Sequence, residues 1–120
     1  MAGYQDLKVW QSGMRLTLGV YRLTLEFPDD EKFGLVSQLR RAAVSVPSNI
    51  AEGHAKNSSG EMVRFANIAL GSLAEIETQL LIAKSLEYSK HQKIDSLLAI
   101  AAETARMLHG LIRSRKQSDS

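Results

Sequence analysis

The chain has 120 residues, of which 44% are hydrophobic types, so it is long enough to bury a core, and we expect a single domain over residues 1–120. Its 15 Lys and Arg against 13 Asp and Glu give a net charge of +2, which is too small to indicate nucleic-acid binding by itself. The absence of Cys excludes disulfides, thiol catalysis and zinc–thiolate sites. We see no signal-peptide pattern and no apolar run near the roughly 20 residues that span a bilayer, and therefore expect a cytoplasmic protein without a membrane partner.

Apolar residues at three- and four-residue spacing predict a first helix from about Leu7 to Leu25, with Asp6 as its N-cap. These residues form two stripes along the helix. The stripe that we expect to face the core consists of Leu7, Trp10, Met14, Leu18, Tyr21 and Leu25. The second stripe consists of Val9, Leu16, Val20 and Leu23. A second stripe is more than a bundle face needs and indicates self-association, with a wide core face in a small bundle as the alternative.

The dipeptide Phe27-Pro28 ends the first helix, and the acidic residues 29–31 suit the start of a second. Its inward positions are Phe33, Val36, Leu39, Ala43, Val46 and Ile50. Pro47 lies inside this apolar pattern and predicts a defined kink, because a proline removes one backbone hydrogen bond of the helix. Gly53 is expected to end the helix as a left-handed cap.

A capping box, Ser58 with Glu61, predicts the start of a third helix that runs to about Leu86. Its inward face holds Met62, Phe65, Ala69, Leu73, Ile76, Leu80 and Ala83, while Ile68, Leu70, Leu81 and Ile82 lie off that face. A turn at residues 87–89 leads to a fourth helix from about Lys90 to Ile112. Its inward residues are Ile94, Leu97, Leu98, Ala101, Ala105, Leu108 and Ile112. The polar residues 114–120 are expected to fray.

Few aromatics, many Leu, Ala and Ile residues and no alternating β-branched runs favour an all-α domain. Because the connections are short, consecutive helices are expected to pack antiparallel. The sequence therefore predicts an up-down-up-down four-helix bundle whose second helix is kinked at Pro47.

The chain resembles the four-helix-bundle proteins known as 23S rRNA-intervening-sequence proteins. The resemblance covers Tyr4 to about Tyr88. It rests on residues 4–10 and on Phe27-Pro28 with Glu31 and residues 33–35. It rests further on residues 38–43 with Ser45, Pro47 and residues 48–53, and on residues 69–73 with Glu75, Glu77, Gln79 and Leu80. It implies a homopentamer of bundles around a central channel, without catalytic activity. A similar fold serves as the accessory protein of diversity-generating retroelements, where a basic pentamer binds nucleic acid.

A set of polar residues near the predicted kink is the first candidate site, comprising Arg40, Arg41, Asn49, Glu52 and Glu75. They either line a channel or pocket, or hold the structure together, and we favour the structural role because buried polar groups are usually hydrogen-bonded. In that role Asn49 satisfies carbonyls freed by Pro47, Glu52 pairs with one of the two arginines, and an arginine reaches Glu75 or Glu77.

Two surfaces are candidates for partners. The candidates for an oligomer interface are Val9, Leu16, Val20, Leu23, Leu70 and Leu81. The candidates for RNA or DNA contacts are Lys8, Arg15, Arg22, Arg113, Arg115 and Lys116. A basic stripe repeated around an oligomer would multiply phosphate contacts. The alternative is an ordinary solvated face in which Arg22 pairs with Glu26.

Nothing in the sequence points to catalysis. His54, His91 and His109 are isolated and form no metal-binding pattern, and no serine has a base that the pattern places beside it. We therefore expect no cofactor and no metal. Two functions remain: a homo-oligomeric scaffold that binds itself or a protein partner, and an accessory protein that binds RNA or DNA.

Overall fold

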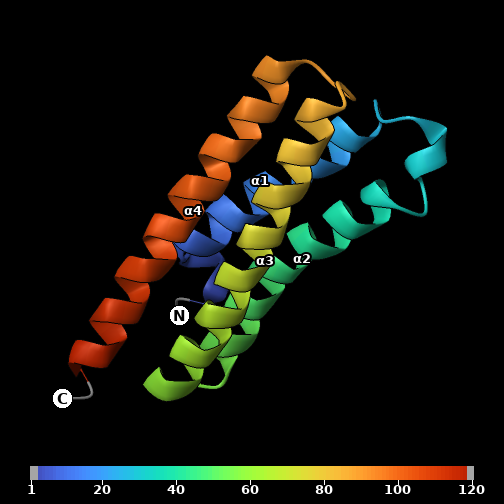
Figure 1. Cartoon of the computed structure of the whole chain (residues 1–120). Coiled ribbons are helices and arrows are strands. Elements are labelled where there is room, and N and C mark those ends of the chain that lie inside the picture. The colour runs from blue at the N-terminus through green and yellow to red at the C-terminus, as the bar shows by residue number, and fades with distance from the viewer. Residues whose placement is uncertain (1–2, 119–120) are drawn as a thin grey trace.

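The computed structural model describes residues 3–118, and within them it contains only helices. The elements are the 3₁₀ turn η1 (Tyr4–Asp6), α1 (Lys8–Thr24), the 3₁₀ turn η2 (Asp29–Glu31), α2 (Leu35–Ala55), α3 (Ser59–Ser85) and α4 (His91–Ser118). Figure 1 shows the four long helices packed along a common direction, in a molecule of 48 × 21 × 19 Å. The predicted all-α bundle of four helices is confirmed.

The helices form a four-cornered arrangement. α1 packs against α2 and α4, and α3 packs against the same two helices, whereas within residues 3–118 no Cα atom of α1 lies within 8 Å of a Cα atom of α3. α1 and α3 therefore occupy opposite corners of the bundle. It follows that their outward faces point to opposite sides of the molecule.

Hydrogen bonds between helices show the direction in which neighbours run. Ser12 bonds to Thr104 at 2.6 Å, and Glu26 accepts from Lys93 at 2.7 Å, so the residue number rises along α1 as it falls along α4. Figure 1 places the α2–α3 connection and the α3–α4 connection at opposite ends of the bundle. Connections at alternate ends are the arrangement expected when consecutive helices are antiparallel and joined by short loops.

The core face of α1 is the reverse of the prediction. The second stripe is buried, with Leu16 and Val20 fully enclosed, while Leu18 is 47% and Leu25 79% exposed. The buried side also carries Gly13, where an added Cβ would lie 3.2 Å from a methyl group of Val46 in α2. Small residues on the buried side of α1 let α1 and α2 approach closely. These small residues distinguish the core face of α1 from its other apolar stripe, which apolar periodicity alone does not do.

Two helix ends differ from the prediction. Asp6 is not the N-cap of α1: it lies in η1, and Leu7 occupies the cap position without a side-chain hydrogen bond. Gly53 does not end α2 but lies buried inside it, where an added Cβ would come 2.8 Å from the Cβ of Phe65 in α3. The residue with a left-handed conformation after α2 is Asn57, with φ of 55°.

α2 is helical on both sides of the buried Pro47, and the predicted bend of its axis stays a prediction. The inward positions predicted for α2 are buried except Phe33, which precedes the helix and is 89% exposed. Phe33 was wrongly placed because the backbone of residues 32–34 is a turn rather than part of the helix.

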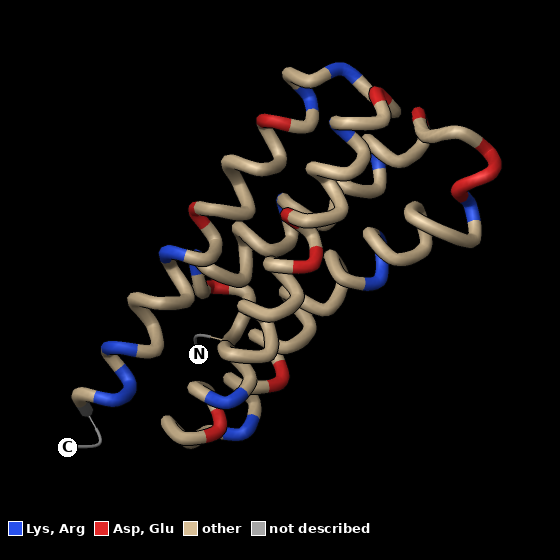
Figure 2. Tube along the Cα trace, in the orientation of Figure 1, with Lys and Arg blue, Asp and Glu red and all other residues tan. Residues whose placement is uncertain are grey.

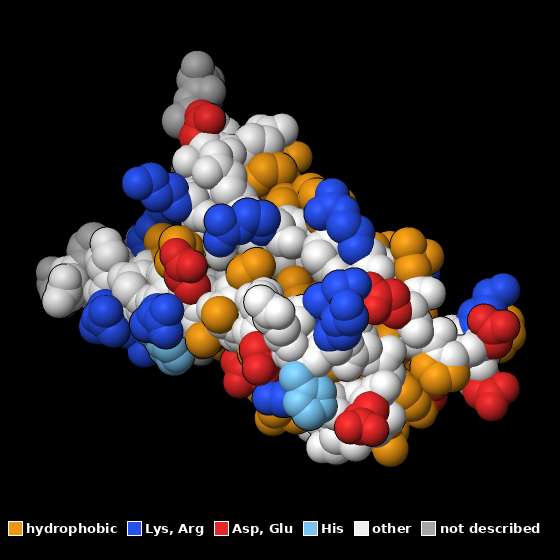
Figure 3. All heavy atoms as spheres, turned by 90° about the horizontal axis from the view of Figure 1, so that it is seen from above, with side chains coloured by type: hydrophobic (Ala, Val, Ile, Leu, Met, Phe, Trp, Pro, Cys, Tyr) orange, Lys and Arg blue, Asp and Glu red, His pale blue; other side chains and the backbone are white. Residues whose placement is uncertain are grey.

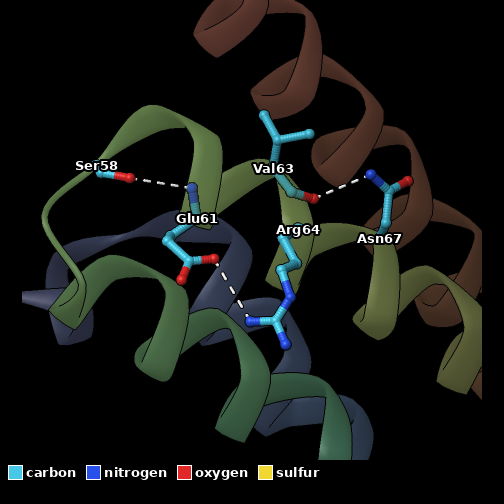
Figure 4. A network of polar contacts seen from close by, with 5 residues as sticks. All are labelled: Ser58, Glu61, Val63, Arg64 and Asn67. Atoms are coloured by element: carbon cyan, nitrogen blue, oxygen red, sulfur yellow. Dashed lines mark hydrogen bonds and ion pairs between the residues drawn. The ribbon is translucent and has the colours of Figure 1, made fainter.

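α3 and α4 follow the sequence closely. The predicted inward residues of α3 are all buried, while Leu98 and Ala105 of α4 are half-buried rather than buried. Ser58 caps α3 by accepting from the Glu61 amide at 3.1 Å, and the Glu61 carboxylate lies 3.4 Å from Arg64 (Figure 4). α4 continues to Ser118, so residues 114–118 are helical, and the fraying predicted for them stays a prediction; residues 119–120 lie outside the described part.

Candidate interaction surfaces

The outward face of α1 carries a row of apolar side chains. Leu18, Tyr21 and Leu25 are exposed, and Met14 and Trp10, one and two turns before Leu18, are half-buried. The spacing of three and four residues places all five on one side of the helix. We refer to these five residues as the α1 apolar row. Exposed apolar groups in a continuous row are typical of a surface that meets a partner.

A second exposed apolar set lies on α3. Ile68, Leu81 and Ile82 are 42–51% exposed, and Leu70 is half-buried. Because α3 stands opposite α1 in the bundle, this set faces another side of the molecule. The predicted interface residues thus separate into two groups. Leu70 and Leu81 remain accessible to a partner. The prediction for α1 was wrong, because burial in the core keeps all four of its residues away from any partner: Val9, Leu16, Val20 and Leu23.

The predicted basic residues of α1 are exposed along the side of the helix that faces α4. Arg15 lies 4.0 Å from Glu103 of α4. The pairing of Arg22 with Glu26, given above as the alternative, does not form, because Glu26 is held by Lys93 at 2.7 Å and by Ser89 at 2.9 Å. Arg22 therefore has no ion pair in the described part of the chain.

The remaining basic candidates lie at the end of α4, where Figure 2 shows Lys and Arg concentrated. Arg113 and Lys116 are exposed and Arg115 is half-buried. On the face seen in Figure 3, acidic side chains lie among the basic ones. The basic residues thus form scattered points of positive charge rather than one continuous basic patch on that face.

The polar set predicted near Pro47 is not one cluster. Arg40 donates to Thr24 Oγ1 at 2.9 Å and stacks 4.6 Å over the Tyr21 ring, so it belongs to the α1–α2 contact. Asn49 donates to the backbone oxygen and the hydroxyl of Ser45 at 2.7 and 2.8 Å. Glu52 is exposed and, within residues 3–118, forms no ion pair with either arginine.

Arg41 and Glu75 line one groove of about 590 Å³ between α2 and α3. Neither forms an ion pair with the other or with another described residue. Ser45 and Ser72 bond across the groove at 2.8 Å, and Gln79 donates to Gln38 at 3.4 Å. Sequence reasoning missed Ser72 and Gln79, although both are polar residues on the predicted inward face of the third helix.

At one end of the bundle, two loops are joined by charged hydrogen bonds. The Tyr88 hydroxyl donates to the Glu31 carboxylate at 2.7 Å, and the Leu35 amide donates to the same carboxylate at 3.1 Å. These donors lower the pKa of Glu31, and the carboxylate raises the pKa of Tyr88. The hydrogen bonds from Lys93 and Ser89 lower the pKa of Glu26 in the same way.

Residues 3–118 contain neither a cluster of metal ligands nor a helix that could span a membrane. No three His, Cys, Asp or Glu side chains gather in a way that would hold a metal ion. No helix in this part of the chain has the length and apolar character that a membrane span requires.

The fold and these surfaces define a helical-bundle protein with exposed apolar side chains on two sides. The chain belongs to the 23S rRNA-intervening sequence protein family, whose model matches residues 5–110. The predicted family resemblance is thereby confirmed.

The fold is similar to a crystal structure from Bacteroides thetaiotaomicron VPI-5482, a protein with unknown function from the S23 ribosomal protein family, with a TM-score of 0.77. The two chains are 21% identical, and the likeness covers 87% of this chain and 97% of the other. At that identity the likeness shows the fold alone. No curated protein matches this chain in sequence.

Proposed function

We propose that this chain is a non-enzymatic scaffold protein that assembles with copies of itself. The observation that carries the proposal is the pair of exposed apolar surfaces, the α1 apolar row and the set Ile68, Leu81 and Ile82 on α3. A monomer rarely leaves apolar groups in such surfaces uncovered. The proposal includes a cytoplasmic location, which suits a sequence without cysteine.

The two surfaces face different sides of the bundle, which favours contacts between unlike surfaces of successive copies. Such head-to-tail contacts generate a ring when the rotation closes. The family resemblance implies five copies around a channel. We adopt the pentamer as part of the proposal, with other proteins recruited to the outside of the ring.

The test compares two substitutions on α1. Leu25, which is 79% exposed, becomes Asp in one variant, and the fully buried Leu16 becomes Asp in the other. Leu25→Asp is expected to raise the dissociation constant of the oligomer at least about tenfold while the chain stays folded. Leu16→Asp is expected to unfold the chain, because it leaves a charge in the core.

The readouts are light scattering after gel filtration for mass and circular dichroism for helicity. An oligomer that Leu25→Asp leaves unchanged, at wild-type helicity, would remove the α1 apolar row from the interface. A wild-type chain that is monomeric would contradict the scaffold itself.

The second candidate function is binding of RNA or DNA. It is favoured by the length of α4, which stays helical beyond its predicted end at Ile112. This part of the helix holds Arg113 and Lys116 one turn apart on an exposed face. Together with Lys8, Arg15 and Arg22 they would contact phosphates, and a ring would repeat them in every copy.

A Lys8, Arg15, Arg22 triple-alanine variant tests this function in filter binding with structured RNA and duplex DNA at two salt concentrations. We expect wild-type binding that weakens steeply with salt, and a loss of about tenfold or more in the folded variant. Equal binding by both proteins would exclude these three residues as contacts.

A further inference from the structure

The groove between α2 and α3 holds two opposite charges that do not pair. Arg41 of α2 and Glu75 of α3 both line it. Their charged nitrogen and oxygen atoms lie more than 4.0 Å apart, and neither side chain forms an ion pair within residues 3–118. A groove that offers one positive and one negative group is complementary to a ligand that carries both charges.

The same groove has a spare hydrogen-bond donor. The hydroxyls of Ser45 and Ser72 bond to each other at 2.8 Å, and Ser45 Oγ already accepts from Asn49 at 2.8 Å. The two hydroxyls carry two protons, and the bond between them uses only one. The second proton has no acceptor among the described residues, whichever of the two hydroxyls keeps it.

The groove also has a spare acceptor. Gln79 lines it and is only 9% exposed, and its Oε1 is a buried oxygen without a hydrogen-bond partner within residues 3–118. The Gln79 amide bonds to Gln38 at 3.4 Å through its nitrogen. Because the last torsion of a glutamine side chain is broad, the amide can turn its oxygen toward a donor in the groove. A buried acceptor left unpaired costs stability, so a ligand that supplies an N–H is favoured.

The spacing of these groups assigns the two halves of a ligand. Arg41 and Ser45 are one turn apart on α2, so one carboxylate can accept from both of them. Glu75 and Gln79 are one turn apart on α3, so one ammonium group, with three protons, can donate to both of them. A carboxylate toward α2 and an ammonium group toward α3 are the two charged groups of a free amino acid.

An exposed aromatic ring favours one kind of amino acid. Phe33 also lines the groove, and it is 89% exposed. A ring on the ligand would cover part of this side chain, and aromatic pairs gain more than their buried area alone. The groove volume of about 590 Å³ leaves room for such a ring, since small-molecule sites measure about 300–1,000 Å³.

We propose that this groove binds a free aromatic amino acid. Arg41 and the spare hydroxyl proton hold its carboxylate, Glu75 and Gln79 Oε1 hold its ammonium group, and its ring packs against Phe33. The site lies within one chain and uses no residue of the α1 apolar row or of the apolar set on α3. It is therefore independent of the self-assembly proposed above.

Three ligands test the proposal by isothermal titration calorimetry of the full chain. The first is free phenylalanine. The second is phenethylamine, which lacks the carboxylate, and the third is phenylpropionate, which lacks the ammonium group. We expect phenylalanine to bind at one site per chain, and each analogue to bind at least about tenfold more weakly, because it leaves one charged group of the groove unpaired.

Variants of the groove residues test each contact. Arg41→Gln and Glu75→Gln are each expected to raise the dissociation constant of phenylalanine at least about tenfold. Phe33→Ala is expected to bind phenylalanine no more tightly than free alanine. Arg106→Gln on α4 and Glu77→Gln on α3 are the matched controls, because neither residue lines the groove. Both should bind like wild type, and circular dichroism checks that every variant is folded.

Each outcome decides the proposal. Absence of binding by phenylalanine up to about 10 mM overturns the site. An analogue that binds as tightly as phenylalanine, or wild-type binding by folded Arg41→Gln or Glu75→Gln, overturns the recognition of both charges. Light scattering of the same samples reports the assembly separately, so a monomeric chain that binds phenylalanine contradicts the scaffold and supports this site.

Discussion

A side chain of α1 completes the backbone hydrogen bonding of α2 at its proline. Pro47 has no amide hydrogen, so the carbonyl of Ala43, four residues earlier, lacks its helical donor. The Thr17 hydroxyl of α1 lies 2.9 Å from this carbonyl and 2.8 Å from the Gly13 carbonyl of its own helix, so its single proton is shared between the two acceptors. Asn49, which sequence reasoning chose for this role, bonds Ser45 instead.

This assignment predicts an energetic coupling between Thr17 and Pro47. Thr17→Val leaves the buried Ala43 carbonyl without a donor and is expected to cost about 1–3 kcal/mol of the free energy of unfolding. In a Pro47→Ala background the new amide supplies the donor, and the cost of Thr17→Val should fall by about 1 kcal/mol. Urea denaturation of the four proteins measures the coupling.

The control for this cycle is Thr78→Val, because Thr78 is exposed and donates only within α3, to the Ala74 carbonyl. Its effect should be the same with Pro47 and with Ala at that position. Equal costs of Thr17→Val in both backgrounds would show that the Thr17 hydroxyl does not replace the missing amide.

At the scale of single elements, periodicity predicted each helix but did not always identify its buried side. The buried face of α3 was predicted correctly, although apolar residues also lie off that face, at Ile68, Leu81 and Ile82. α1 was wrong because both of its stripes are apolar, and the choice depends on Gly13 and Thr17, which pack against α2. Contacts between helices are not visible in the spacing of a single helix, so sequence alone does not rank two such stripes.

The hydrogen bond between Tyr88 and Glu31 links the α3–α4 connection to η2, which lies between α1 and α2. The pKa of Glu31 lies below its ordinary 4.5, so the ionised carboxylate stabilises the fold above that pH, and the contribution is lost as pH falls through the lowered pKa. The pKa of Tyr88 lies above its ordinary 10.0, so its neutral hydroxyl stabilises below pH 10.0 and the contribution is lost as pH rises through the raised pKa.

Tyr88→Phe should therefore lower Tm most between about pH 5 and 9, where Glu31 is ionised and Tyr88 is neutral. The difference from wild type should shrink below about pH 4, as Glu31 becomes protonated. Thermal unfolding followed by circular dichroism across this range measures it. Tyr4→Phe is the control, because the Tyr4 hydroxyl forms no hydrogen bond with the described residues, and a pH-independent loss in Tyr88→Phe would contradict the assignment.

For the whole molecule, the sequence predicted the fold class, because four amphipathic segments with short connections allow few other arrangements. It predicted the family through its resemblance in particular motifs, such as residues 4–10 and Phe27-Pro28. It did not predict the surfaces that a partner would meet. Those depend on which helices stand opposite each other, and on which charges are already paired within the chain. Glu26 illustrates this, because its carboxylate bonds to Lys93, 67 positions further along the chain, and not to Arg22, one turn away.

The arrangement of the described residues places two sets of exposed apolar side chains on opposite corners of the bundle. These sets are the basis of the proposed ring of copies, which the four-helix fold alone does not require. Assembly is therefore the central claim, and the roles of the basic residues and of any partner depend on it.

The most direct test of that claim is the native mass of the unmodified chain, measured by light scattering after gel filtration over a hundredfold range of concentration. We predict a species of about 66 kDa, five times the 13.2 kDa of one chain, that persists on dilution. A mass of 13.2 kDa at every concentration would contradict the account.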